Sequence, residues 1–198
     1  GTPLDEAPAD SFPDALADPA HEVRAIVVRV SGLPEGATFR WLPRGEGSSL
    51  GGRASRRGEQ VPGLETYVAT FARDAAACAV EIRVASGPWR TESSDAGEGG
   101  RSLEANGHKF YFGKARGYRG GTAIAVAHNI VDRDNRFVAI DNEGKVHTAV
   151  YSSGGGHPIL SLLDAEFDIP PERIRRYEVR ARPFERAEIK EVALRPRS

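Results

Sequence analysis

The sequence predicts an all-β protein built as an antiparallel β-sandwich of about ten strands. Apolar residues alternate with polar ones along most of the chain, which is the period of a half-buried strand. The chain contains 22 glycines and 13 prolines among 198 residues, a turn-rich composition that suits short strands. Residues 158–168 also fit a short helix, but their alternation favours a strand.

The composition narrows the classes of partner. With 27 basic and 28 acidic groups the net charge is -1. Proteins that bind nucleic acids or anionic membranes usually carry an extended positively charged surface. We therefore expect no nucleic-acid partner and no direct membrane contact by this segment. Cys78 is the single cysteine, so we expect neither an internal disulfide nor a cysteine-based zinc site.

Residues 1–20 differ from the rest of the chain. They contain five acids, four prolines and no base, and their few large apolar side chains cannot offset the entropy lost on ordering. We expect an acidic, Pro/Ala-rich linker over 1–20 and a β-sandwich domain over 21–198. Because the chain begins with Gly rather than Met, we expect the linker to tether this domain to a larger protein.

The first half of the domain contains four strand patterns. Strands are expected at 22–30 and 38–43, joined into a hairpin by the turn sequence SGLPEGA,. The Gly- and Ser-rich stretch 43–63 predicts a long exposed loop, and a strand follows over 64–71. The strand over 78–86 has the clearest alternation, with four apolar residues on one face: Cys78, Val80, Ile82 and Val84,.

A second polar stretch, 91–107, predicts another loop before the next strands. These strands are expected at 108–113, 122–129 and 136–141. The first of them should bury Phe110 and Phe112 on one face and expose Lys109 and Tyr111 on the other.

Turn signals organise the remainder. Residues 141–144 predict a hairpin turn, with Gly144 in the position that tolerates positive φ. Residues 152–156 predict a flexible run, and Pro170-Pro171 predicts a turn. Two strands should follow, broken at Pro183, and the apolar register slips between Ile189 and Val192, which predicts a bulge. No repeat of fixed period is visible, and the alternative to one sandwich is two smaller packed sandwiches divided near residue 100.

The closing segment, YEVRARPFERAEIKEVAL, resembles that of a β-rich extracytoplasmic domain of large bacterial proteins, which also carry sigma-factor-like or membrane metallopeptidase-like regions. Arg180 stands where Gln is usual in that domain, and Arg186 where Trp is usual. SGLPEGA, ASGPW and FVAIDNEGKVH are also similar to it, so the resemblance spans about residues 22 to 194. Positions in register with the pattern are Tyr177, Arg182, Pro183, Phe184, Glu188, Ile189, Val192 and Leu194.

This resemblance implies a location outside the cytoplasmic membrane, on the periplasmic or cell-surface side. It also implies attachment to a membrane-associated signalling or regulatory part. The domain it points to carries no assigned activity.

Histidines and acids give no metal-binding pattern of known spacing. His21-Glu22 begins like a zincin motif, but Ala25 stands where the second histidine is required,. Three histidines at strand ends could still meet an acid in space, which keeps a metal-dependent hydrolase as one alternative: His128, His147 and His157, with Asp132, Asp134 or Asp141,.

Trp89 follows a strand at Gly-Pro, where an indole closes the end of a core or forms a surface platform. Core closure is the favoured interpretation. Sugars stack on exposed aromatic platforms, so a carbohydrate-binding module that uses Trp89 is a second alternative. Trp89, Arg180 and Arg186 are the candidate binding residues.

The sequence thus predicts a non-enzymatic sensory or protein-interaction module that recognises an unknown protein or small ligand. No catalytic residue, metal ligand or cofactor is assigned.

Overall fold

The structure is a computed structural model, and it describes residues 20–44, 49–56, 59–157 and 160–194. Within these residues it contains sixteen strands and one short 3-10 helix, and the strand pairs are antiparallel. The predicted all-β fold is confirmed. The number of strands is larger than the ten predicted, because segments that the sequence predicts as loops also pair with neighbouring strands. The predicted linker lies outside the described residues, except for residue 20.

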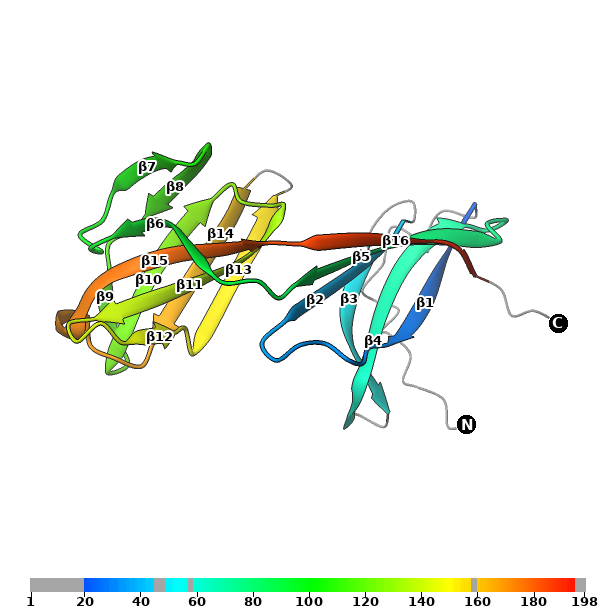
Figure 1. Cartoon of the computed structure of the whole chain (residues 1–198), viewed down its shortest axis with the longest axis horizontal. Coiled ribbons are helices and arrows are strands. Elements are labelled where there is room, and N and C mark those ends of the chain that lie inside the picture. The colour runs from blue at the N-terminus through cyan, green and yellow to red at the C-terminus, as the bar shows by residue number, and fades with distance from the viewer. Residues whose placement is uncertain (1–19, 45–48, 57–58, 158–159, 195–198) are drawn as a thin grey trace. The chain divides into compact units, whose positions relative to one another are not determined.

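The chain divides into two compact units, and each is labelled strand by strand in Figure 1. Unit 1 comprises the described residues up to Val84 and those from Glu185 onward, and unit 2 comprises Ala85–Phe184. Unit 2 is inserted between two neighbouring strands of unit 1, because the last strand of the chain pairs with the strand that ends at Ala85. The division therefore lies at these two crossings and not near residue 100.

Unit 1 consists of two three-stranded sheets, with strand orders β1-β4-β3 and β16-β5-β2. Residues from both sheets share one apolar cluster, so the sheets pack face to face around Trp41, Ala69, Phe71 and Val80. The strands are β1 (His21–Arg29), β2 (Thr38–Arg44), β3 (Ser49–Arg56), β4 (Glu59–Ala72), β5 (Ala77–Ala85) and β16 (Glu185–Ala193).

Unit 2 consists of a six-stranded sheet, in which β13-β14-β10-β8-β7 form the path and β9 pairs with β10, and a four-stranded sheet of order β12-β11-β15-β6. A 3-10 helix, η2 (Pro171–Arg173), precedes β15. The strands are β6 (Arg90–Asp95), β7 (Arg101–Ala105), β8 (His108–Phe112), β9 (Arg116–Tyr118), β10 (Gly121–His128), β11 (Arg133–Asp141), β12 (Val146–Thr148), β13 (Tyr151–His157), β14 (Leu160–Phe167) and β15 (Ile174–Pro183).

Aromatic rings fill the interior of unit 2. Phe137 on β11 lies 5.7 Å from Phe167 and 5.9 Å from Tyr177, measured between ring centroids, and Phe112 lies 6.2 Å away. Burial raises the pKa of Tyr177 to about 12, although a hydrogen bond with Thr122 acts in the opposite direction. The two sheets of unit 2 are therefore joined by a continuous aromatic core.

Several predicted details are confirmed. Phe110 and Phe112 are buried while Lys109 and Tyr111 are exposed. The turn after Asp141 joins β11 to β12, with Gly144 at φ +86°. Residues 160–167 form a strand and not a helix.

The predicted bulge in the last strand is also confirmed. The register of β16 against β5 shifts between Ile189 and Val192, and Glu191 lies there at φ +57°. The preceding break between strands falls at Phe184, one residue after Pro183.

The loop predictions were wrong in part. β3 and the start of β4 lie within 43–63, and β7 and all of β6 except Arg90 lie within 91–107. The run 152–156 lies in β13, which pairs with β14. Backbone hydrogen bonds to a partner strand hold these polar segments, so the strands form without an apolar pattern of their own.

The predicted first hairpin was also wrong. β1 pairs with β4, whereas β2 belongs to the sheet of β5 and β16. The segment between them carries the chain from one sheet of unit 1 to the other.

Candidate functional site

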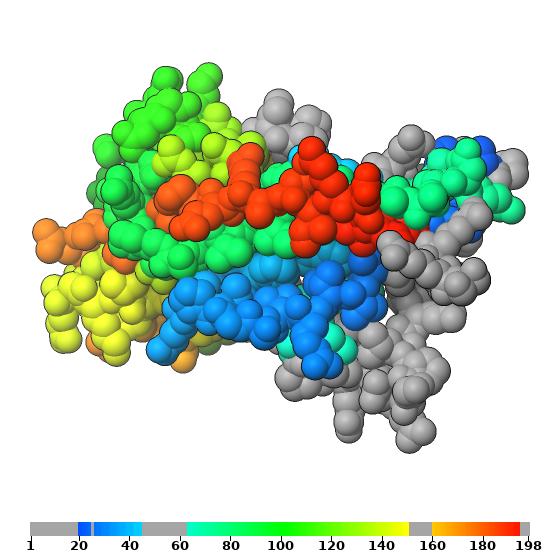
Figure 2. Space-filling view, turned by 45° about the vertical axis from the view of Figure 1, so that its right-hand side comes forward, coloured from blue at the N-terminus to red at the C-terminus, as the bar shows by residue number. Residues whose placement is uncertain are grey.

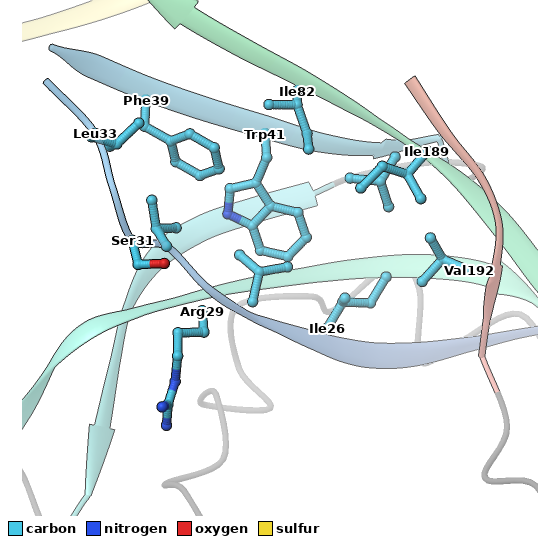
Figure 3. A pocket seen from close by; sticks show the side chains of 12 residues that line it. Ile26, Arg29, Ser31, Leu33, Phe39, Trp41, Ile82, Ile189 and Val192 are labelled. Atoms are coloured by element: carbon cyan, nitrogen blue, oxygen red, sulfur yellow. The ribbon is translucent and has the colours of Figure 1, made fainter. Parts of the chain in front are cut away.

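An apolar pocket of about 480 Å³ opens into the interior of unit 1. Figure 3 shows its lining side chains around the indole of Trp41. The lining comes from both sheets, since β1 supplies one side and β2, β5 and β16 supply the other. The lining residues are Ile26, Val28, Arg29, Val30, Ser31, Leu33, Phe39, Trp41, Val80, Ile82, Ile189 and Val192.

Strand alternation positions the side chains of the lining. On β5, Val80 and Ile82 share one face, and on β2, Phe39 and Trp41 do the same,. On β1, Val28 lines the pocket while Val27 is 41% exposed on the other face of the strand.

The bulge in β16 contributes to the same pocket. Ile189 and Val192 are three positions apart, so in a regular strand their side chains would point to opposite faces. The register shift and the left-handed backbone of Glu191 bring both residues into the lining. The bulge therefore increases the apolar surface that β16 presents to the pocket.

Trp41 is the largest group in the lining and is only 6% exposed. Its ring lies 5.4 Å from that of Tyr67 in a tilted arrangement. In Figure 3 its indole nitrogen lies on the side of the ring that faces Ser31. The indole thus presents an apolar ring to the pocket, and its N–H donor lies towards the end of the pocket where Ser31 is located,.

Polar groups are scarce in this lining. Ser31 and Arg29 are the polar residues among the twelve, and the Arg29 guanidinium points away from the indole in Figure 3. Ligand pockets of roughly 300–1,000 Å³ with apolar walls and a few polar groups are typical small-molecule sites. The arrangement suits an apolar group transferred from water, with one hydrogen bond to orient it.

Trp89, a predicted binding residue, lies in unit 2 and is partly exposed. The guanidinium carbon of Arg136 lies 4.3 Å from its ring centroid, and that of Arg182 lies 4.1 Å away. The ring therefore makes intramolecular cation–π contacts, which an incoming sugar would have to displace or share.

Arg180 lies near this cluster, opposite Arg136 on the neighbouring strand. It forms an ion pair with the buried Glu178 at 2.7 Å. Burial raises the pKa of Glu178, but hydrogen bonds from Arg180, Arg176 and Thr91 outweigh this effect, so the net shift is downward.

Arg186 belongs to the other unit, on the exposed strand β16 of unit 1, whose atoms are red in Figure 2. Its charge acts on the buried Glu81, whose pKa is lowered first by a hydrogen bond from Arg83 and then by the charges of Arg83, Arg44 and Arg186. The structure thus brings Trp89 and Arg180 into one region of unit 2 and places Arg186 in unit 1.

Among the described side chains, the histidines form no shared metal site. His147 pairs with the buried Asp141 at 2.8 Å within the β11–β12 hairpin, and this hydrogen bond lowers the pKa of Asp141. His128 is 4% exposed and its Nδ1 has no hydrogen-bond partner in the described structure. The side chain of His157 lies outside the described residues. Within the described part of the chain, no three His, Cys, Asp or Glu side chains are grouped to hold a metal.

A second, more polar hollow of about 440 Å³ lies in unit 2 on the outer side of β7 and β8. Tyr111, which is 45% exposed, lines it together with Glu104 and Lys109. Tyr111 is therefore a more open aromatic surface than Trp89.

Comparison of the chain with protein-family models, with curated proteins and with solved structures gave no match. Among the described residues, no helix has the length and apolar character needed to cross a membrane.

Proposed function

We propose that the protein is a non-enzymatic binding module whose first unit holds an apolar ligand, or the apolar part of a larger one, between its two sheets. The resemblance of the closing segment supports a place for this module outside the cytoplasmic membrane, within a larger regulatory protein. Binding of the ligand would be the signal that the module passes on.

The pocket around Trp41 is the observation that carries this proposal. A domain of this size ordinarily fills its interior with side chains, since empty apolar volume forfeits dispersion contacts and destabilises the fold. The described residues of unit 1 instead leave about 480 Å³ open and lined by apolar side chains. An apolar ligand that enters this space removes its own surface and that of the lining side chains from water, and this burial favours binding.

The neutral fluorescent probe N-phenylnaphthylamine tests the proposal directly. We expect the probe to brighten on saturable binding to the full chain at one site. The variant Val28→Phe fills the pocket from β1 and should abolish most of the binding. Val27→Phe adds the same ring on the other face of the same strand, where the side chain is 41% exposed, and should retain it.

Circular dichroism and thermal melting separate loss of the pocket from loss of the fold. If Val28→Phe does not fold, Val30→Phe at the edge of the lining is the replacement, because that side chain is only half-buried. Equal probe binding by folded Val28→Phe and Val27→Phe would overturn the proposal, and so would the absence of saturable binding to the wild-type chain.

A second candidate is carbohydrate binding, which the exposed Tyr111 in the hollow of β7 and β8 favours. The ring supplies a stacking surface, and Glu104 and Lys109 supply hydrogen-bonding groups,. Saturable binding of a glycan that Tyr111→Ala abolishes and Trp89→Phe retains would support this function and place it away from the tryptophan.

A further inference from the structure

The outer face of β11 and β15, two neighbouring strands of the four-stranded sheet in unit 2, carries an excess of positive charge. Residues on β11 and β15 that share this face point away from the aromatic core, since their neighbours Phe137, Val179 and Ala181 belong to it,. Four arginines and two acids lie there, so the formal charge is +4 − 2 = +2: Arg136, Arg176, Arg180, Arg182, Asp134 and Glu178.

Both acids on this face already accept hydrogen bonds from arginines. Glu178 accepts from Arg176 at 2.6 Å and from Arg180 at 2.7 Å. Asp134 accepts from Arg182 Nε at 2.9 Å. The carboxylates therefore account for three of the four guanidinium groups.

Arg136 is the fourth, and its surroundings are unfavourable for a cation. It stands directly opposite Arg180 in the register of β11 and β15, and like charges in opposed positions destabilise a sheet. Its Nε is buried without a hydrogen-bond partner in the described structure. Burial lowers the pKa of Arg136, as do the charges of Arg180 and Arg182, while Asp134 acts in the opposite direction.

The local structure nevertheless holds Arg136 in place. Its guanidinium carbon lies 4.3 Å from the Trp89 ring centroid, and such a cation–π contact fixes a guanidinium plane against an aromatic surface. Arg180, whose side chain is 19% exposed, is held by its ion pair with Glu178. Two arginines, each held by a contact of its side chain, thus occupy directly opposed positions on a partly exposed face.

We propose that Arg136 and Arg180 form a binding site for an oxyanion, a carboxylate or phosphate group of a ligand, on the outer sheet face of unit 2. An oxyanion between the two groups converts their repulsion into two attractive pairs. It also supplies acceptors to a guanidinium that has five N–H donors. This site is independent of the apolar pocket, because the two lie in different units.

Titration with inorganic phosphate, and separately with acetate, tests the site on the full chain. Chloride at matched ionic strength controls for general screening of charge. The readout is the indole N–H signal of Trp89 in a nitrogen-edited NMR spectrum. We expect a saturable shift of that signal with one of the two oxyanions and not with chloride, and the responding oxyanion identifies the ligand class.

Arg136→Gln should weaken this binding about tenfold or more, because hydrogen bonds to charged groups contribute about 1.5–3 kcal/mol. Arg136→Lys keeps the charge but loses the forked donors, so we expect intermediate affinity. Arg175→Gln, an exposed arginine on the same strand β15, should leave the affinity unchanged. Absence of a saturable shift, or equal affinity in Arg136→Gln and Arg175→Gln, would overturn the inference whatever the outcome for the apolar pocket.

Discussion

Four aromatic rings connected through Phe137 fill the interior of unit 2, whereas the described residues of unit 1 contain one close aromatic pair and a pocket of about 480 Å³. Both units are built from two antiparallel sheets, so the architecture alone does not produce the difference. The difference lies in which side chains occupy the inward positions. Phe137 in unit 2 lies beside three other rings, whereas Trp41 lies beside one ring among the described residues of unit 1 and lines the pocket.

The contrast indicates a division of roles between the units. A filled core leaves no interior space for a ligand, so the oxyanion site that we propose for unit 2 lies on its surface, at the arginines around Trp89. A unit with unfilled apolar volume has a lower free energy of unfolding than the same unit with a filled core. Such a loss of stability is common at binding sites, where function and stability compete. Each unit contains one of the two tryptophans, so each can be observed separately.

The largest effect that sharpens this contrast is expected from Phe137→Ala. Loss of a buried phenylalanine costs about 3–5 kcal/mol of unfolding free energy, because the neighbouring rings cannot close the space. Ile82→Ala in the pocket lining should cost about 2 kcal/mol, near the low end for such truncations, since its surroundings are already open. Denaturant unfolding of fluorotryptophan-labelled protein, read by fluorine NMR, measures both. Equal costs would contradict the claim that the two interiors differ in packing.

A pH effect is expected in unit 2 from His128. Burial lowers its pKa, and the nearby His108 lowers it further. The unfolded chain therefore binds more protons than the folded one, so stability is present above the unfolded pKa of about 6.5 and is lost as pH falls through the folded pKa.

Denaturant unfolding at pH 7.5 and at lower pH, read at the Trp89 signal, measures this loss. His128→Gln should flatten the pH dependence of unit 2 between about pH 7.5 and 5.5, and His108→Gln should reduce it. An unchanged pH dependence in His128→Gln would show that another group is responsible.

The smallest effect is expected in unit 1 at the bulge of β16. Glu191 lies at φ +57°, where a residue with a Cβ is strained by about 1 kcal/mol relative to glycine. Glu191→Gly should therefore raise the stability reported by the Trp41 signal by up to about 1 kcal/mol. Glu185→Gly, in the extended part of the same strand, should lower it, because glycine weakens a regular strand. Changes of the same sign in both variants would mean that the backbone of Glu191 is not under strain.

Local pattern predicted the strands that bury their own apolar residues. The alternation of β5, the turn at Gly144 and the slip between Ile189 and Val192 were all readable, because each depends on a few neighbouring residues. The strands at 49–56 and 101–105 were not, since their pairing with β4 and β8 holds them in place despite polar or Gly-rich sequences. The pairing of β1 with β4 is a long-range choice that no turn sequence encodes.

The candidate sites were less predictable than the fold. Alternation identified Val80 and Ile82 as inward-facing residues, but it does not show that volume remains between two sheets. Trp89 and Arg180 were predicted as binding residues, whereas Arg136 was missed. The signal for Arg136 was its alternation with Phe137, which assigns it to the outer face, but the register that sets it opposite Arg180 requires the structure.

Titration of the wild-type chain with N-phenylnaphthylamine, observed through the two indole N–H signals, tests the central contrast most directly. The account predicts that the Trp41 signal shifts saturably while the Trp89 signal stays in place. A shift of the Trp89 signal instead, or no shift of the Trp41 signal, would contradict it.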